Sequence, residues 1–437
     1  MRTGIERREF LRSAAAIGAA LYSTGCASQD SKPDDINVAI LGAGEQGNVL
    51  LMDSCVKMKG LRFKAVCDVW KTWSLDRTSG RLKAYKHEHN TYEDYREMLD
   101  KEKDLDAVII ATPDFWHSKH TVACLKAGLH VYCEKEMSNT LEGARKMVEA
   151  AKASGKILQI GHQRRSNPSY LYCYEKLIKE AKLLNRITTV NGQWNRSRRA
   201  CEELGVSNKY KIDQKTLEKY GFESMTQFRN WRWYKGLGGG PIVDLGSHQI
   251  DVYNWFLGAN PKSVIAGGGT DYWKGRQWYD NIMAIFEYDT KAGPVRAFYQ
   301  TLTTNSSHGY FETFMGDEGT LMVSEGQGRT AIYREDWVPP EKWEKWVKKG
   351  YIKATVKPPK ALAGGQTPEP PKYEILTRSS DILHYAHLEN FFDAIRGKAK
   401  PNCPAEVGYE TAVSVLKVNE AVAAGRKLEF KPEDFKV

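Results

Sequence analysis

The sequence predicts an α/β domain with a parallel sheet, followed by an α+β domain with a large, mostly antiparallel open β-sheet. The chain has 437 residues, 41% hydrophobic and 27% charged, which is an ordinary globular composition in a chain too long for one small core. Strand and helix patterns alternate over residues 36–156. From residue 157 onward, most predicted strands follow one another without an intervening helix, which is typical of an antiparallel sheet.

The composition also excludes several classes of protein. The 12 Trp, 22 Tyr and 14 Phe residues are too many for a chain that is mainly disordered. No apolar run reaches the ~20 residues of a spanning helix, so a polytopic membrane protein is excluded. The formal net charge is +10, but the lysines are spread along the chain and form no basic helix, so no nucleic-acid partner is predicted.

The first 35 residues read as an export signal and a tether. Arg7-Arg8 is a twin-arginine pattern, an apolar stretch of small residues follows at 14–21, and a polar tether runs over 29–35. Cys26 is a candidate for lipidation, and cleavage after Ala27 is the alternative. These features predict twin-arginine export to the periplasm or cell envelope, with membrane contact only through an N-terminal lipid.

The cysteines indicate neither a disulfide framework nor a zinc site. The eight cysteines include no Cys-x-x-Cys pair and no zinc-finger spacing. Cys67 and Cys133 lie in apolar strand patterns, so we expect both to be buried small hydrophobic residues.

A glycine-rich turn follows the first predicted strand, at 37–41. Gly42 permits a tight turn, Gly44 lets the backbone approach a pyrophosphate, and Gly47 lets the following helix pack close to the strand. The pyrophosphate would then lie at the positive end of that helix. Strand, Gly-x-Gly-x-x-Gly and helix in this order predict a Rossmann dinucleotide-binding domain over 36–156.

Asp68 ends the second predicted strand, at 62–66. Its carboxylate can accept hydrogen bonds from a ribose diol and would repel a 2′-phosphate, so NAD is favoured over NADP. Lys71 or Arg77 nearby would be the residues that accommodate NADP.

The alternation continues to the end of this domain. We expect a helix at 92–99, a buried strand at 105–111, a loop at 112–117, a helix at 118–127 and a strand at 130–133. Ligands of such sheets bind outside the carboxyl ends of the strands. The loop after each of the last two strands should therefore face the cofactor.

Six short motifs, taken together, identify a family. The chain resembles the Gfo/Idh/MocA oxidoreductases from about residue 36 to its end. The resemblance implies that Lys135 lies between nicotinamide and substrate, and that an Asp-x-x-x-His pair binds substrate and transfers protons. The family usually has Pro where this chain has Glu136. The motifs are GAGEQG at 42–47, Asp68, ATPDFWH at 111–117, CEKE at 133–136, NWR at 230–232 and DLGSHQID at 244–251.

The cofactor-binding candidates come from the glycine turn, the strand ends and, by resemblance, the NWR motif. They are Gly42, Gly44, Gln46, Gly47, Asp68, Thr112, Pro113, His117, Glu134, Lys135, Trp231 and Arg232.

The predicted helix after Pro241 carries the catalytic candidates Asp244 and His248, to which Lys135 is added. Asp244 and His248 are four residues apart and share a helix face. His248 is a natural general base, and Asp244 would orient it or bind a sugar hydroxyl. Lys135 would polarise the reacting oxygen or take the proton itself. Hydride transfer to nicotinamide needs no metal, so the alternative of metal ligands that include Asp251 is disfavoured and no metal is predicted.

The second domain, at 157–437, should bind substrate and mediate oligomerisation. The substrate candidates are Arg164 in a basic turn, Trp194 and Asn195 at a strand end, and His308 and Tyr310 in a loop. The polar segment 200–230 is expected to be an insertion near the pocket, and 353–373 a long loop. A strand at 157–160 should open this domain, helices are expected at 241–257, 381–397 and 406–425, and His384 and His387 should lie on a helix surface. The resemblance implies a homo-oligomer paired through the outer face of the sheet.

Three functions are consistent with these motifs. The first is an exported NAD(P)-dependent oxidoreductase acting on a secondary alcohol of a sugar, cyclitol or glycoside. Exported enzymes have no access to cytoplasmic NADH recycling, so the cofactor should be tightly bound. The alternative is a redox-neutral NAD-dependent glycosidase, which oxidises the sugar transiently, eliminates the aglycone and returns the hydride. A non-catalytic sugar-binding protein is the third, and the joint presence of Lys135, Asp244 and His248 argues against it.

Overall fold

The computed structural model describes residues 35–326, 328–355, 369–377 and 382–437. The twin-arginine pattern, Cys26 and the tether up to residue 34 lie outside the described residues. Within the described part of the chain, no helix is long and apolar enough to cross a membrane.

The first sheet is parallel and has the strand order β3-β2-β1-β4-β5-β6. Leu41, the last residue of β1, lies beside Cys67 of β2 and Ile110 of β4, so the carboxyl ends of the central strands lie together. This arrangement confirms the Rossmann domain. The strands are β1 (Ile36–Leu41), β2 (Leu61–Cys67), β3 (Asn90–Tyr92), β4 (Ala107–Ile110), β5 (His130–Cys133) and β6 (Leu158–Ile160).

Helices cover both faces of this sheet, which explains why its central strands are continuously apolar. Leu50, Leu82 and Leu388 pack on one face, and Leu125 and Met147 on the other. The helices involved are α2 (Glu45–Asn48) with its helical continuation to residue 57, α3 (Asp76–Ala84), α4 (Tyr95–Lys101), α5 (Asp114–Lys126), α6 (Leu141–Ser154) and α12 (Tyr385–Ile395).

Three predicted boundaries in this region are wrong. The helix expected at 92–99 begins at Tyr95, because Asp94 caps it by accepting a hydrogen bond from the Arg96 N–H. The loop expected at 112–117 ends at Pro113, because Pro113 precedes the first turn of α5 and Asp114 opens that turn. The strand expected to open the second domain is β6, which pairs in parallel with β5 and belongs to the first sheet.

The second sheet has ten strands in the order β14-β15-β13-β12-β11-β7-β10-β9-β8-β16, and it is the large open sheet that was predicted. All its pairs are antiparallel except β7 with β10. Its strands are β7 (Ile187–Asn195), β8 (Pro261–Gly269), β9 (Asn281–Thr290), β10 (Gly293–Leu302), β11 (Tyr310–Gly316), β12 (Gly319–Val323), β13 (Ala331–Arg334), β14 (Ile352–Ala354), β15 (Lys372–Ile375) and β16 (Leu428–Glu429).

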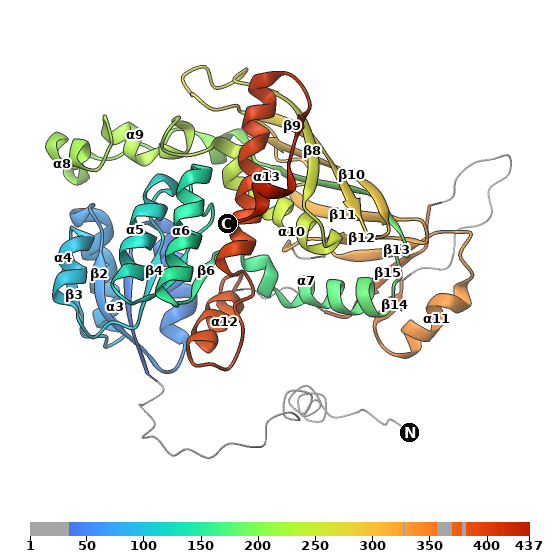
Figure 1. The fold of residues 1–437 in the computed structure, drawn as a ribbon, viewed down its shortest axis with the longest axis horizontal. Helices are drawn as coiled ribbons and strands as arrows, with labels where there is room; N and C mark the ends of the chain where they lie inside the picture. Colours follow the sequence, from blue (N-terminus) through green and yellow to red (C-terminus); the bar gives the residue numbers. More distant parts are fainter. Residues whose placement is uncertain (1–34, 327, 356–368, 378–381) are drawn as a thin grey trace, which may run out of the picture. The chain divides into compact units, whose positions relative to one another are not determined.

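One face of the second sheet packs against helices. Tyr253 and Phe256 of α10 (Ser247–Leu257) are buried with Phe286 and Phe314 of the sheet. The long helix α13 (Ala405–Ala424) also packs against β8 and, on its other side, against α6 and β6 of the first domain. Figure 1 shows α13 between the two sheets, so this helix joins the two cores.

One further expectation for the second domain is wrong, and another differs at its ends. His387 is fully buried, where its Nε2 donates to the Ile160 carbonyl oxygen (2.9 Å) and its Nδ1 lies 2.6 Å from the Ser166 hydroxyl. The predicted long loop contains β14 and β15 at its two ends, and its middle lies outside the described residues.

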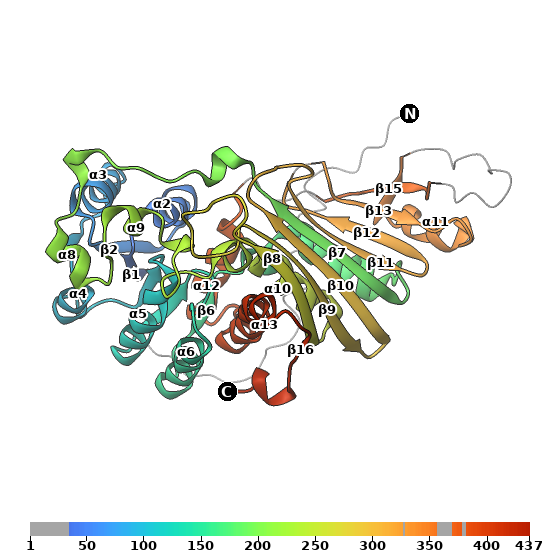
Figure 2. The same ribbon diagram turned by 90° about the horizontal axis from the view of Figure 1, so that it is seen from above.

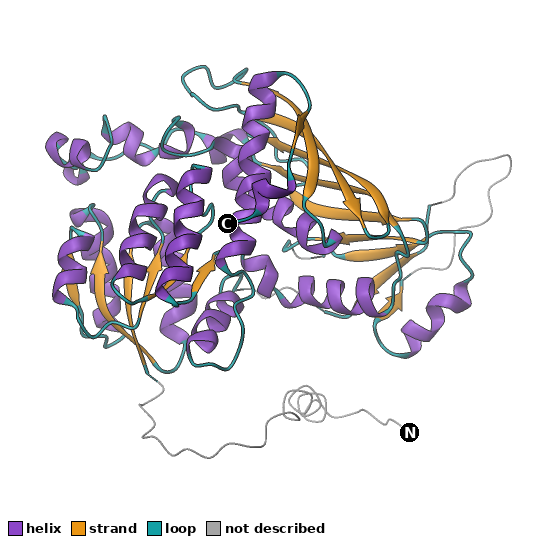
Figure 3. Cartoon of the chain, viewed as in Figure 1, coloured by secondary structure: helices purple, strands orange, loops and turns teal. Residues whose placement is uncertain are grey.

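Residues 200–234 form a segment that we call the strap. It carries the short helices α8 (Gln214–Lys219) and α9 (Met225–Arg229), seen in Figures 2 and 3 beside the first domain. An aromatic cluster joins the strap to that domain, with Tyr220 and Phe222 packed near Trp70 and Phe115. The cysteine prediction is also confirmed, since Cys67 and Cys133 are buried free thiols.

Candidate active site

A cavity of about 650 Å³ runs along the carboxyl ends of the parallel strands and reaches the second sheet. The glycine turn, the ends of β2, β4 and β5, the strap and the start of α10 all contribute to its lining. The structure therefore brings the predicted cofactor and catalytic motifs to one cavity.

The glycine turn has the form that a dinucleotide requires. Gly42 has φ +93°, and a side chain there would lie 2.6 Å from the carbonyl carbon of Ala111. A side chain at Gly47 would collide with the Gly42 carbonyl. Gly44, by contrast, faces open space and lines the cavity. An anion can therefore approach the backbone at Gly44, where the helix begins, and the turn fits a dinucleotide pyrophosphate.

Asp68 lies at the end of β2 and lines the cavity. Its carboxylate accepts hydrogen bonds from the Ala43 N–H and the Trp70 N–H, both at 2.7 Å. Burial raises the pKa of Asp68 to about 6, although the two N–H groups oppose this rise. Asp68 thus ties the glycine turn to the end of β2, which the sequence did not predict, while its ribose contact stays a prediction.

His117 joins the two loops that were expected to face the cofactor. Its Nε2 lies 2.6 Å from the Thr112 carbonyl oxygen, and its Nδ1 lies 2.7 Å from that of Glu136. Burial lowers the pKa of His117 to about 4. His117 is therefore a positioning residue that holds the Thr112-Pro113 turn against the loop of Lys135.

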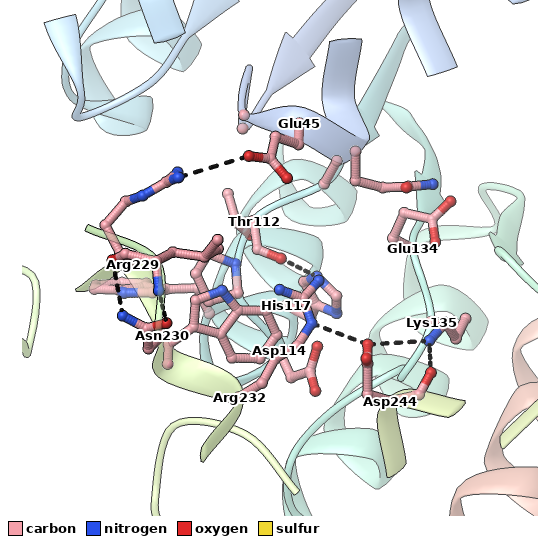
Figure 4. A pocket seen from close by; sticks show the side chains of 18 of the residues that line it. Glu45, Thr112, Asp114, His117, Glu134, Lys135, Arg229, Asn230, Arg232 and Asp244 are labelled. Carbon is pink, nitrogen blue, oxygen red and sulfur yellow. Dashed lines mark hydrogen bonds and ion pairs between the residues drawn. The ribbon is translucent and has the colours of Figure 1, made fainter. Parts of the chain in front are cut away.

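Lys135 and Asp244 face each other in the cavity (Figure 4). The Nζ atom of Lys135 donates to the Asp244 carbonyl oxygen and lies 3.6 Å from its carboxylate. Arg232 donates to the same carboxylate at 2.9 Å, and Arg196 lies 3.9 Å from it. Burial alone would raise the pKa of Asp244, but these three cations hold it well below its usual value.

His248 is buried on α10, with its ring 5.2 Å from that of Trp194. Its Nδ1 has no hydrogen-bond partner among the described residues. Burial, followed by the charge of Lys135, holds the pKa of His248 well below its usual value, so the ring is neutral. Of the two roles expected for Asp244, orientation of His248 is wrong, because the Asp244 carboxylate is turned to Lys135 and the two arginines, and its contact with a sugar hydroxyl stays a prediction.

Asp114 is a cavity residue to which the sequence reasoning gave no role. It is buried at the first turn of α5, near Lys135 and Arg232. Burial raises its pKa to about 7, and the two cations oppose this rise. Its place directly after Thr112-Pro113 at a strand end was the signal that could have identified it.

The predicted substrate residues separate into two groups. Trp194 and Tyr310 stack with ring centroids 4.6 Å apart, and both line the cavity. Arg164 is instead fully buried, because Glu312 and Glu325 pair with its guanidinium. Asn195 and His308 are also outside the cavity lining.

The remaining candidates are placed as follows. Gln46 lines the cavity, where its Nε2 lies 3.2 Å from Nε2 of His384, and Glu134 and Trp231 also line it. The carboxylate of Asp251 pairs with Arg165 at 2.8 Å and accepts a hydrogen bond from Thr411 at 2.9 Å. Asp251 is thus committed to a buried network and is not directed at the cavity with Asp244.

Two family models match most of the chain. Residues 36–162 match the model described as "Oxidoreductase family, NAD-binding Rossmann fold" of GFO_IDH_MocA. Residues 211–430 match the model described as "Oxidoreductase family, C-terminal alpha/beta domain".

The chain spans about half the length of two curated dehydrogenases that it matches. The chain is 29% identical to "scyllo-inositol 2-dehydrogenase (NADP(+)) IolW" of Bacillus subtilis over 238 residues. This match covers 54% of this chain and 55% of that protein. It is 27% identical to "D-glucoside 3-dehydrogenase" of Escherichia coli over 223 residues, and this match covers 51% of this chain and 54% of that protein. A solved structure of levoglucosan dehydrogenase in complex with NADH aligns with a TM-score of 0.67 at 18% identity, covering 91% of this chain and 99% of that one. This last likeness shows the fold.

Proposed function

Because the chain belongs to the Gfo/Idh/MocA oxidoreductase family, we propose that it is an exported enzyme that oxidises a secondary alcohol of a sugar, cyclitol or glycoside with NAD, or catalyses the reverse reduction. The observation that carries this proposal is one cavity. It is lined by the glycine turn, by Lys135 at the tip of β5 and by His248 of α10. Asp68, which would repel a 2′-phosphate, supports NAD over NADP.

The bound nicotinamide would supply the hydride acceptor, and the residues of this chain would handle the oxygen and its proton. The Nζ atom of Lys135 donates to the Asp244 carbonyl oxygen and lies 3.6 Å from the Asp244 carboxylate, so it is held in the cavity where it can donate a further hydrogen bond to the reacting oxygen. His248 lines the cavity and its ring is neutral, so the ring can accept the hydroxyl proton. We therefore assign Lys135 to polarisation of the oxygen and His248 to proton removal.

The stacked Trp194 and Tyr310 rings support a ring-shaped, polyhydroxylated substrate. Aromatic faces pack against the apolar C–H face of such rings and leave the hydroxyl groups to polar partners. Trp194 lies beside His248, so a ring held by Trp194 would present a hydroxyl near the proposed base. Arg196, which directly follows β7 and lines the cavity, is a polar partner for those hydroxyl groups.

Export, a tightly held cofactor and a homo-oligomer are part of the same proposal. The twin-arginine pattern and Cys26 support export and a lipid anchor. On the outer face of the second sheet, Ile265, Met283 and Ile285 are 45%, 49% and 43% exposed. Ile265 and Ile285 are direct partners on β8 and β9, so an apolar patch supports pairing of two copies through this face. Mass measurement by light scattering would report a monomer if this expectation is wrong.

The test uses the purified mature protein with its retained nucleotide, incubated with a panel of sugars, cyclitols and aryl glycosides. We expect a product lighter by two hydrogens, with any aglycone still attached, and no product from Lys135→Met. Lys135→Met should still bind nucleotide. Released aglycone with an unoxidised sugar would instead identify the redox-neutral glycosidase, and turnover by Lys135→Met would refute the assigned residues.

A further inference from the structure

Arg229 is a cavity residue at the end of α9 on the strap, and no role has yet been assigned to it. Its side chain is 16% exposed. Its guanidinium lies over the ring of Trp70 at 5.1 Å, and Trp70 in turn donates its backbone N–H to Asp68. Arg229 therefore lies at the Asp68 end of the cavity.

The guanidinium of Arg229 is incompletely paired. Among the described residues, its ion pair is with Glu45, at 3.7 Å, and the Glu45 side chain is 78% exposed. The Nε atom of Arg229 is buried and has no hydrogen-bond partner among the described residues. A buried guanidinium usually forms short, paired hydrogen bonds to a carboxylate, because its five N–H donors are costly to leave unsatisfied. Arg229 thus retains capacity for an anion.

The surroundings of Arg229 indicate which anion this is. Glu45 is the residue directly after Gly44 in the glycine turn, and Figure 4 shows Arg229 reaching toward it. Arg229 therefore spans from the pyrophosphate turn to the residues beside Asp68. A dinucleotide in this fold has its adenosine diphosphate half at that end, whereas its nicotinamide half lies toward Lys135.

Hydrogen bonds attach the strap that carries Arg229 to the first domain, and two of them come from indole groups of that domain. The indole N–H of Trp70 donates to the Tyr210 carbonyl oxygen at 2.6 Å. The indole N–H of Trp116 donates to the Tyr220 carbonyl oxygen at 3.1 Å. One attachment follows β2 and the other lies on α5, so the strap crosses the cavity between them.

We propose that Arg229 binds the adenosine diphosphate half of the dinucleotide and so fastens the strap over the bound cofactor. This inference rests on the proposed function only in requiring a dinucleotide in the cavity. Nucleotide release then requires the strap to move, and the cofactor remains bound between turnovers. A second substrate in the same pocket must therefore take back the hydride and a proton, which leaves oxidised cofactor.

The test compares Arg229→Met with wild type and with Arg198→Met. Arg198 is a matched control, because its side chain is 62% exposed and pairs with Glu202 at 3.7 Å. The nucleotide-free proteins are titrated with NADH, ADP-ribose and nicotinamide mononucleotide by calorimetry, and NADH dissociation is followed by fluorescence. We expect Arg229→Met to weaken NADH and ADP-ribose about 10- to 100-fold, as for loss of a charged hydrogen bond. Nicotinamide mononucleotide binding should not change, and Arg198→Met should match wild type.

The inference is overturned if the ADP-ribose affinity of Arg229→Met is no lower than that of wild type, or if the affinity for nicotinamide mononucleotide falls by the same factor. A second variant, Glu45→Gln, alters an exposed side chain and should fold. It removes the carboxylate that competes with the nucleotide for Arg229, so ADP-ribose should bind more tightly than to wild type. Weaker binding by Glu45→Gln would also overturn it. Nucleotide binding without oxidation of any tested sugar would refute the proposed function and leave the Arg229 result standing.

Discussion

Replacement of Asp244 by Asn is the sharpest perturbation of the proposed chemistry, because one carboxylate balances three cations. Lys135 lies 3.6 Å from this carboxylate, Arg232 donates to it at 2.9 Å, and Arg196 lies at 3.9 Å. Asn has nearly the same shape and keeps an acceptor oxygen for Arg232. The substitution therefore removes charge while leaving the packing in place.

The magnitude follows from the Lys135 contact. Two unit charges 3.6 Å apart attract by about 4–5 kcal/mol at an effective dielectric constant of ~20. The Asp244 side chain is 21% exposed, so water weakens this attraction, and the retained acceptor recovers part of it. We expect a net loss of about 2–4 kcal/mol of transition-state stabilisation, which is about a 30- to 1,000-fold lower kcat/KM.

The assay measures kcat/KM for the substrate that the product-mass screen identifies, together with NADH affinity and Tm. NADH affinity should change by less than about threefold, because Asp244→Asn keeps an acceptor oxygen for Arg232 of the strap and lies outside the glycine turn. Asp100→Asn, which alters a side chain that is 85% exposed, is the control for loss of one carboxylate. If Asp244→Asn retains kcat/KM within about threefold of wild type, the charge-balance reasoning is refuted.

Three further predictions concern the base, the aromatic platform and a buried acid. His248→Gln should lower kcat about 10²- to 10⁴-fold with NADH affinity unchanged, and an unaltered kcat in steady-state kinetics would remove His248 as the base. Trp194→Ala should raise KM for the sugar about 5- to 100-fold, since an aromatic contact worth about 1–3 kcal/mol is lost, whereas an equal fall in NADH affinity would indicate general disruption. Burial raises the pKa of Glu136 to about 8, so the folded chain keeps a proton that the unfolded chain releases, and stability falls as pH rises toward 8. The free energy of unfolding of Glu136→Gln, measured relative to wild type by urea unfolding, should therefore be about 2–3 kcal/mol higher at pH 9 than at pH 6. The same difference from wild type at both pH values would contradict this protonation.

Local patterns predicted much of the first domain, because its signals lie within a few consecutive residues. The Gly42 turn needs a positive φ and the Gly47 position has no room for a side chain, so the glycine spacing itself reports the geometry. The open second sheet was also predictable from its succession of strands. Boundaries were less certain where a cap decided them, as at Asp94 and Pro113.

The dinucleotide turn, the order of the two domains and the motifs that carry Lys135, Asp244 and His248 can all be predicted from the sequence. What each charged side chain faces becomes visible in the folded chain. Arg164 and Arg196 look alike in the sequence, yet one is buried between Glu312 and Glu325 and the other lines the cavity. The fold also sets the partners of Asp244, which turns to Lys135 instead of His248, and of Arg229, which the strap brings to the glycine turn. The physical reason is that backbone patterns are local, whereas the partner of a charge is set by residues far away in the chain.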